Sequence, residues 1–357
     1  MAIEKLPSGK YRAVVRHNGH KAASAAVATR AEAAMEEAHL KMQMGAAPLR
    51  TGHTVGELVA AYVADTRIKR SPATADYYAQ ASTLMPPLFA ERLVSDVTVY
   101  IVDQMYSELA RAGVTPNNIV KLHRLLSASF GRALKYGWTN VNPCKGANKP
   151  SPIKSEINPP TVQQVQELIA ESAMVNADLP VFLRLAAQSG ARRGELAALK
   201  WSDISGTKLT IRRSLVADGD TLMVRDTKTH SRGHRALTLD SRTVSELDEL
   251  RSRQRETARE HLLPEPVWVF SHDAGVTPWR PEYLTTAFQR LAHTLRFDVR
   301  LHDLRHFSAT QQLSAGVDVT TVSRRLGHAK VSMTLDTYSH WMPQRDQEAA
   351  DVMGALF

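Results

Sequence analysis

The sequence predicts a multidomain protein that is mainly α-helical and contains one α+β domain in its C-terminal half. Its 357 residues are more than one small core usually serves, at roughly 100 to 200 residues per domain. Helical periodicity dominates residues 54–145, whereas strand-like runs occur near the N-terminus and between residues 208 and 239. Five prolines in residues 139–160 interrupt regular structure, so this stretch is predicted to be an interdomain linker.

Residues 1–50 are predicted to form a small β-sheet followed by a helix. A strand-like run at 11–16 precedes the pair Asn18-Gly19, which favours a two-residue hairpin turn before a weaker second strand. Thr29 and Glu32 form the signature of a capping box at the start of the helix. A small basic sheet can lie in a DNA groove, although a solvated surface explains this segment equally well. The basic candidates are Lys10, Arg12, Arg16 and Lys21.

Residues 54–145 are predicted to form a compact helical bundle. Four successive segments each begin at a capping Ser or Thr and place apolar residues at positions i, i+3 and i+4. Basic residues on the last of these helices are spaced for one face, which either contacts nucleic acid or is simply solvated. They are Lys121, Arg124, Arg132 and Lys135.

Residues 161–357 are predicted to form the α+β domain. Two helices come first, beginning near residues 161 and 178. Three strands follow at 208–217, 221–227 and 234–239, separated by the Asp218-Gly219 turn and a polar turn. Helices then continue to a C-terminal tail.

Composition and charge restrict the partners and the compartment. The net charge of +9 favours a polyanionic partner, because phosphate backbones attract Lys and Arg through counterion release. Cys144 is the only cysteine, which excludes an intramolecular disulfide and a Cys-rich zinc site and favours a reducing interior. The N-terminus has no apolar signal region, and no run approaches the roughly 18 apolar residues that span a bilayer. We therefore expect a cytoplasmic protein with no membrane partner.

The C-terminal half contains a set of residues suited to phosphate chemistry. SGARRGEL contains Arg192, HDLRH spans residues 302–306, LGH ends at His328, and Tyr338 follows. A guanidinium can hold a phosphate through two parallel hydrogen bonds, and a tyrosine is a potential oxygen nucleophile. Taken singly, Arg192 could merely pair with Glu195, and Tyr338 could be a packing residue.

A zinc site at His302 and His306 is the rival interpretation of the HDLRH motif. Two histidines at i and i+4 on a helix can bind zinc, as in HExxH metalloproteases. Here the residue after the first histidine is Asp303, one methylene shorter than glutamate, and Arg305 would repel a cation. We therefore expect no metal.

Together the stretches SGARRGELAALKWSDI, TKTHSRGHRALTL and HDLRHFSATQQLSAGVDVTTVSRRLGHAKVSMTLDTYSH resemble the catalytic domain of the tyrosine recombinases, the phage integrase family. The resemblance covers residues 160–345 and extends to the helical segment before them. It implies an arm-type DNA-binding domain at 1–50 and a helical core-binding (SAM-like) domain at 54–145. The linker at 139–160 and a catalytic domain with a C-terminal tail at 161–357 would complete the chain.

The resemblance also implies a role for each residue of the set. Tyr338 would be the nucleophile, and Arg192 and Arg305 would hold the phosphate oxygens. His302 would donate to the phosphate or help to deprotonate the nucleophile, and His328 would contact the scissile phosphate. Lys228 would protonate the departing 5′-oxygen. The residues implied to support the site are Glu195, Asp303 and His306.

The implied reaction is site-specific DNA recombination through a 3′-phosphotyrosyl intermediate and a Holliday junction, with no metal, ATP or other cofactor. The implied partners are double-stranded core-type and arm-type attachment sites, three further copies in a homotetramer on DNA, a host DNA-bending protein and an excisionase. We expect a nucleoid-associated enzyme in the cytoplasm of a bacterial host.

Within this resemblance, we expect the integrase of a temperate phage or integrative element, which inserts and excises that element. A Xer-like resolvase of chromosome or plasmid dimers normally lacks the separate N-terminal sheet. A catalytically idle DNA-binding regulator would not need an intact set of catalytic residues. A type IB topoisomerase shares the tyrosine chemistry but differs in domain arrangement.

Overall fold

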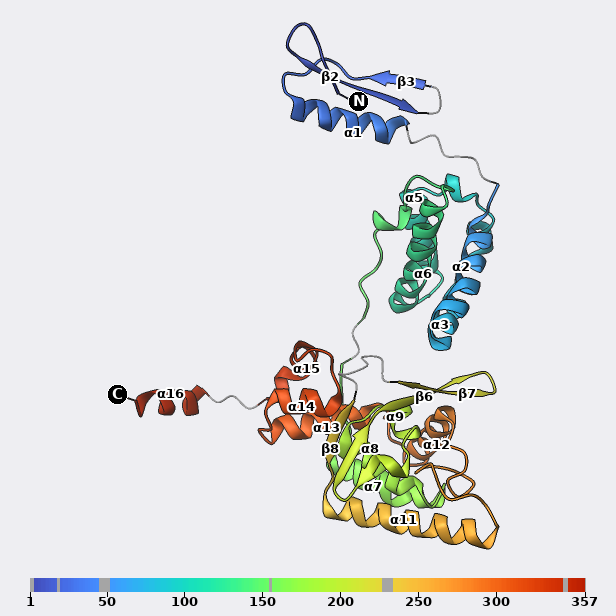
Figure 1. The fold of residues 1–357 in the computed structure, drawn as a ribbon, viewed down its shortest axis with the longest axis vertical. Helices are drawn as coiled ribbons and strands as arrows, with labels where there is room; N and C mark the ends of the chain where they lie inside the picture. Colours follow the sequence, from blue (N-terminus) through green and yellow to red (C-terminus); the bar gives the residue numbers. More distant parts are fainter. Residues whose placement is uncertain are drawn as a thin grey trace. The chain divides into compact units, whose positions relative to one another are not determined.

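The computed structural model describes residues 3–17, 20–44, 52–153, 156–226, 234–342 and 346–356. They fall into two compact units, Met1–Ser155 and Glu156–Phe357. Helices dominate both units and the sheets are small, which confirms the predicted fold class (Figure 1). Among the described residues, no helix is long and apolar enough to cross a membrane.

The first unit begins with a three-stranded antiparallel sheet in the order β1-β2-β3. The strands are β1 (Ile3–Lys5), β2 (Tyr11–His17) and β3 (His20–Ala23), and helix α1 (Arg30–Met44) follows. Ala13, Val14 and Val15 of β2 are buried, as is Ala33 of α1. Strand β1 was not predicted, because three residues with one apolar side chain give no periodic signal.

The capping box predicted at the start of α1 is present. The backbone N–H of Glu32 donates to Thr29 Oγ1 at 3.2 Å, and the Glu32 carboxylate accepts from the backbone N–H of Thr29 at 3.1 Å. Strands β2 and β3 pair with His17 opposite His20. The predicted Asn18-Gly19 turn lies outside the described residues.

A helical bundle makes up the rest of the first unit. As predicted, Thr54, Ser71, Thr98 and Thr115 each cap a helix by accepting a hydrogen bond from a backbone N–H three residues on. The bundle core centres on the apolar face of the last long helix. The elements are α2 (Val55–Lys69), α3 (Pro72–Ser82), α4 (Pro87–Ala90), η1 (Val94–Asp96), α5 (Val99–Arg111), α6 (Pro116–Lys135) and η2 (Pro143–Lys145).

The start of the predicted linker belongs to this bundle. Pro143 and Cys144 are buried within η2, and Cys144 is part of the same hydrophobic core as α6. The proline at 143 therefore opens a short 3-10 turn that packs on the bundle, and a proline-rich composition alone could not show this.

The second unit combines helices with a three-stranded sheet in the order β4-β5-β8 and a separate hairpin of β6 and β7. Its strands are β4 (Ile204–Ser205), β5 (Lys208–Ile211), β6 (Arg213–Asp218), β7 (Thr221–Asp226) and β8 (Arg235–Thr238). Its helices are α7 (Val162–Glu171), η3 (Ser172–Met174), α8 (Leu179–Ser189), α9 (Arg193–Ala197), η4 (Trp201–Asp203), α11 (Ser241–Glu260), α12 (Pro281–Thr294), α13 (Asp303–Ser314), α14 (Val319–Leu326), α15 (Ser332–Tyr338), η5 (Ser339–Trp341) and α16 (Asp346–Gly354).

The single strand predicted for 208–217 was wrong, because the chain divides between two sheets at Arg212. Asp203 is 4% exposed, and its carboxylate pairs with Arg213 at 2.6 Å and with Arg212 at 3.7 Å. Both adjacent arginines therefore turn toward one buried acid, whereas regular alternation would send them to opposite faces. No Gly or Pro marks the break.

Two left-handed glycines end helices whose C-terminal ends approach each other. Gly190 (φ 60°) ends α8 and Gly327 (φ 69°) ends α14. A Cβ on Gly190 would fall 2.5 Å from the Leu326 side chain, so glycine also permits the close approach of these two helix ends.

Candidate active site

Most of the predicted catalytic residues come together around these two helix ends. Arg192 is the N-cap of α9, directly after the Gly190 turn. His302 and Arg305 stand at the start of α13, His328 follows α14, and Tyr338 ends α15. Lys228 lies outside the described residues.

Arg192 is oriented by Glu195. Its backbone N–H donates to one carboxylate oxygen of Glu195 at 2.9 Å, and its Nη1 donates to the other at 3.0 Å. About half of the Arg192 side chain is exposed, at 46%, which leaves part of the guanidinium facing outward. The adjacent Arg193 donates instead to Thr285 of α12. The side chains of these two neighbouring arginines therefore point to different partners.

Arg305 is buried, at 4% exposure, with its guanidinium only partly hydrogen-bonded. Nη1 donates to the carbonyls of Gly190 at 2.6 Å and Leu326 at 2.7 Å. Nη2 is buried with no hydrogen-bond partner among the described residues. Burial, and then the charge of Arg192, lower the pKa of Arg305 to about 10. A buried cation with an unused donor is costly unless an anion completes it.

Arginines donate to three successive carbonyls at the C-terminal end of α14. Arg235 Nε donates to the carbonyl of Arg325 at 2.7 Å, Arg305 to that of Leu326, and Arg192 to that of Gly327 at a long 3.5 Å. The last carbonyls of a helix lack intrahelical partners and carry partial negative charge. The three guanidinium groups therefore fix the loop that leads directly to His328.

Arg235 is the member of this group that sequence reasoning missed. It pairs with Glu195 through two hydrogen bonds, at 2.7 Å and 3.2 Å, and the side chains are 7% and 4% exposed. Burial alone raises the pKa of Glu195, but the bonds from Arg235 and Arg192 outweigh it and the net shift is downward. The only signal was a basic residue in the strand-like run HRALTL, which does not show that the residue has a buried partner.

His302 is exposed at the start of α13 and His328 is partly buried, and both are neutral near pH 7. Burial, followed by the charges of neighbouring residues, lowers the pKa of each to about 4. Nδ1 of His328 lies 2.7 Å from Thr334 Oγ1, and the ring of His302 meets that of His306 edge-on at 5.2 Å. A neutral imidazole has one donor and one acceptor nitrogen, so each ring can donate a hydrogen bond to a phosphate.

Tyr338 is buried, at 2% exposure, and its hydroxyl lies 2.7 Å from Nδ1 of His306. Burial raises the pKa of Tyr338, while Arg305 lowers it in part. The phenol is thus protonated at neutral pH and needs a proton acceptor before it can attack.

Asp303 is engaged outside this cluster. Its carboxylate accepts from the backbone N–H of Arg300 at 2.7 Å and from Arg300 Nη2 at 3.0 Å. The loop before α13 is thereby held in place, so Asp303 supports the position of His302 indirectly.

Of the predicted DNA-binding residues in the N-terminal sheet, Lys10 and Lys21 are exposed. Arg12 pairs with Glu4 at 3.0 Å. Arg16 lies in β2, and its side chain is outside the described set.

In the helical bundle, Lys121 and Arg124 both contact Tyr77 of α3. Arg132 is 22% exposed and pairs with Asp65 at 2.6 Å. Lys135 is exposed at the end of α6. Lys135 is therefore free to meet a phosphate, whereas Arg132 is held by an ion pair and Lys121 and Arg124 already contact a tyrosine.

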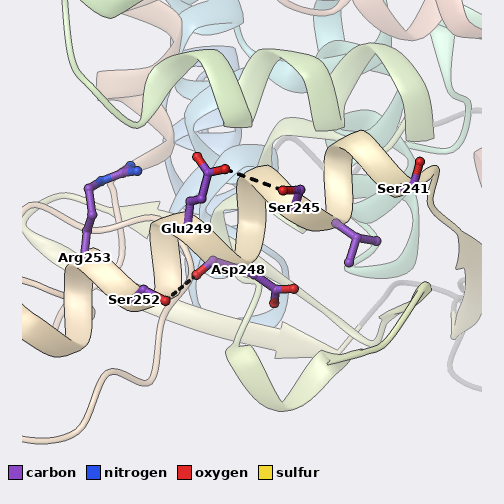
Figure 2. A pocket seen from close by; sticks show the side chains of 7 residues that line it. Ser241, Ser245, Asp248, Glu249, Ser252 and Arg253 are labelled. Atoms are coloured by element: carbon purple, nitrogen blue, oxygen red, sulfur yellow. Dashed lines mark hydrogen bonds between the residues drawn. The ribbon is translucent and has the colours of Figure 1, made fainter.

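Among the hollows in the described part of the second unit, one lies beside α14 and another beside α11. One of about 540 Å³ lies between β8 and α14 and is lined by Arg235, Arg324, Arg325 and His328, among others. The other follows the surface of α11, where Ser245 bonds Glu249 and Ser252 bonds the backbone of Asp248 (Figure 2). Only the first borders the candidate site. No cluster of potential metal ligands occurs among the described residues.

The chain is similar to known integrases and tyrosine recombinases. The model of the phage integrase family matches residues 161–345. The ICEBs1 integrase of Bacillus subtilis is 25% identical over 380 residues that cover 100% of each chain. A XerC-like tyrosine recombinase of Caldanaerobacter subterraneus is 26% identical over 72% of this chain and 70% of its own.

Two solved structures share the fold at 17% identity. A Tn1549 transposon integrase in complex with a circular intermediate DNA has a TM-score of 0.70 and covers 85% of this chain and 99% of its own. A lambda integrase tetramer bound to a Holliday junction has a TM-score of 0.61 and covers 97% of each chain.

Proposed function

The chain belongs to the phage integrase family of site-specific tyrosine recombinases, and from its site we propose that Tyr338 cuts and rejoins DNA attachment sites to integrate and excise a phage or mobile element. The observation that carries the proposal is the buried guanidinium of Arg305 with an unused Nη2 beside a buried tyrosine. This arrangement suits a phosphate anion that the tyrosine attacks.

Each side chain then has a chemical task. Arg192 and Arg305 bind the nonbridging oxygens of the scissile phosphate and stabilise the charge that grows on them in the transition state. His302 and His328, both neutral, donate further hydrogen bonds to these oxygens. Glu195 holds Arg192 in place through two hydrogen bonds.

The reaction exchanges one phosphodiester for another. The Tyr338 oxygen bonds to phosphorus as the bond to the 5′-oxygen breaks, which leaves a 3′-phosphotyrosyl link and a free 5′-hydroxyl. Lys228, placed by its resemblance to the family's lysine, gives a proton to the departing oxygen. A 5′-hydroxyl of the partner duplex then attacks the phosphotyrosine. Bond energy is conserved, so the exchange requires no nucleotide hydrolysis.

The proposed DNA partners follow from the two parts of the first unit. The helical bundle contacts core-type DNA, and the N-terminal sheet contacts arm-type DNA. A homotetramer on a Holliday junction is proposed because lambda integrase, a structural neighbour, forms one. A host DNA-bending protein, an excisionase and a place beside the bacterial nucleoid complete the proposal.

Dimer resolution of the Xer type is the second candidate, since a XerC-like recombinase matches most of the chain. The end-to-end match to the ICEBs1 integrase favours integration, because it includes the N-terminal sheet. Replacing Lys10, Arg12 and Lys21 with alanine separates the two. An integrase should lose recombination between arm-bearing sites but still cleave an isolated core site, whereas a resolvase should be unaffected in both assays.

The nucleophile is tested with nicked attachment-site DNA, which traps the covalent complex. The wild type should form a protein–DNA adduct, and Tyr338→Phe should form none. Tyr283→Phe is the matched control, since Tyr283 is a partly buried tyrosine of the same unit. An adduct with Tyr338→Phe would place the nucleophile at another residue.

A further inference from the structure

The hydroxyl of Tyr338 is held by a histidine of the neighbouring helix. His306 of α13 places Nδ1 2.7 Å from the phenolic oxygen of α15. The other two histidines of the site are engaged elsewhere, His328 with Thr334 and His302 edge-on against the ring of His306. Among the described residues, His306 is therefore the one whose ring hydrogen-bonds the proposed nucleophile.

The protonation states allow this hydrogen bond to run from the hydroxyl to the ring. Burial raises the pKa of Tyr338, so its hydroxyl keeps the proton and can donate it. Burial also lowers the pKa of His306, which keeps the ring neutral near pH 7, and Nδ1 is the acceptor in the tautomer that carries its proton on Nε2. In that tautomer the hydroxyl is a proton donor that already faces its acceptor.

The charged groups around His306 allow its ring to take up a proton and release it again. The ring of His306 faces Tyr338 of α15 and Arg300 of the preceding loop. From the first turn of its own helix it faces His302, Asp303 and Arg305. Asp303 favours a positive ring, while the two arginines oppose it. The proton is thus held weakly enough to return when the reaction reverses.

We propose that His306 is the proton acceptor for Tyr338 during DNA cleavage, an inference that rests on the proposed role of Tyr338 as nucleophile. As the tyrosine oxygen bonds to phosphorus, its proton moves to Nδ1 of His306, and the bond to the 5′-oxygen breaks with protonation by the leaving-group acid. In rejoining, His306 returns the proton to the tyrosine oxygen. His302 is then left to bind the phosphate.

A storage role for the same hydrogen bond makes the opposite prediction. If His306 only holds Tyr338 in the protein interior, removing the imidazole frees the tyrosine and cleavage becomes faster. If His306 accepts the proton, its removal slows cleavage. The sign of the change in cleavage rate therefore decides between the two.

The experiment measures single-turnover cleavage of nicked site DNA by His306→Gln between pH 6 and 9. Glutamine can accept the hydrogen bond but not the proton, so we expect a fall of roughly 10²- to 10⁴-fold near neutral pH, with partial recovery as the pH rises. A substrate with sulfur in place of the 5′-bridging oxygen should not restore the rate, because sulfur relieves only the need for leaving-group protonation. His293→Gln, at an exposed histidine of α12, is the matched control.

A second variant, His306→Ala, should regain cleavage when imidazole is added to the buffer, and DNA binding measured alongside shows that the variants are folded. Cleavage by His306→Gln at or above the wild-type rate, or full recovery with the sulfur substrate, would overturn the inference. A wild-type protein that forms no adduct at Tyr338 would instead overturn the proposed function, and the two failures are therefore distinguishable.

Discussion

Replacement of Arg235 by methionine tests the buried network under the site. Methionine keeps an unbranched stem but removes both hydrogen bonds to Glu195 and the bond to the carbonyl of Arg325. Among the described residues, the partner left to the carboxylate of Glu195, at 3% exposure, is then Arg192. A buried carboxylate loses its principal counter-ion.

The expected loss follows from this geometry. Removing one partner of a buried ion pair costs roughly 3–5 kcal/mol, because the remaining charge stays desolvated. For a unit of this size, about 2–4 °C of melting temperature correspond to 1 kcal/mol, so the melting temperature should fall on the order of 10 °C. Cleavage should also slow, since Arg192 is oriented through Glu195.

Urea unfolding of Arg235→Met, Glu195→Gln and the double variant measures the coupling. The double variant should lose less stability than the two single losses added together, because it leaves no unpaired buried charge. Arg255→Met is the control, since its pair with Glu265 is 42% and 70% exposed and should contribute only about 0–1 kcal/mol. A loss for Arg235→Met no larger than that of the control would refute the reasoning.

Further outcomes follow from other parts of the molecule. Gly327→Ala should cost about 1–3 kcal/mol in urea unfolding, because alanine is strained at φ 69° and its Cβ would lie 2.6 Å from the buried guanidinium beside it. The pKa of Glu195 in the folded protein lies below its ordinary 4.5. The stability that its ionised carboxylate contributes is therefore present above pH 4.5 and is lost as the pH falls through the pKa of the folded protein, and a Glu195→Gln protein should lack this acid-dependent loss in urea unfolding. Lys135→Ala should reduce the salt slope of core-site binding by about one phosphate contact, and Arg132→Ala, which removes an ion-paired residue, by less. The thiol of Cys144 is 1% exposed with its pKa raised to about 12 by burial, so maleimide labelling should occur only after the bundle unfolds in urea.

Local signals account for the parts of the fold that the sequence analysis predicted. The helices that begin after Thr54, Thr98 and Thr115 follow from a hydroxyl that accepts a backbone N–H and from apolar residues on one face. Both features lie within a few residues of each other. Such helices can therefore be located without knowing what they pack against.

Features that depend on distant residues were not predicted. The break between β5 and β6 depends on Asp203, whose buried carboxylate draws both Arg212 and Arg213. Arg235 has an ordinary strand neighbourhood, and its importance comes from Glu195, which is 40 residues away in the sequence. Residue types alone could not show either pairing.

The same distinction applies inside HDLRH. Spacing places His302, Arg305 and His306 near one another on the helix surface. Which histidine meets Tyr338 depends on how α15 packs against α13, and the structure selects His306. The motif thus supplied the residues of the site, while their assignment to individual bonds required the tertiary fold.

The electrostatics of the site account for an arrangement that would otherwise be unfavourable. Arg192, Arg235 and Arg305 gather around a single buried carboxylate, Glu195, and the lowered pKa of Arg305 reflects both its burial and the like charge beside it. This excess of positive charge opposes folding in the absence of an anion. A bound DNA phosphate supplies the missing negative charge and accepts from the free donor of Arg305. Binding of DNA at this site should therefore stabilise the second unit against unfolding. The cationic cluster is therefore better understood as half of a protein–phosphate complex than as a network built for stability.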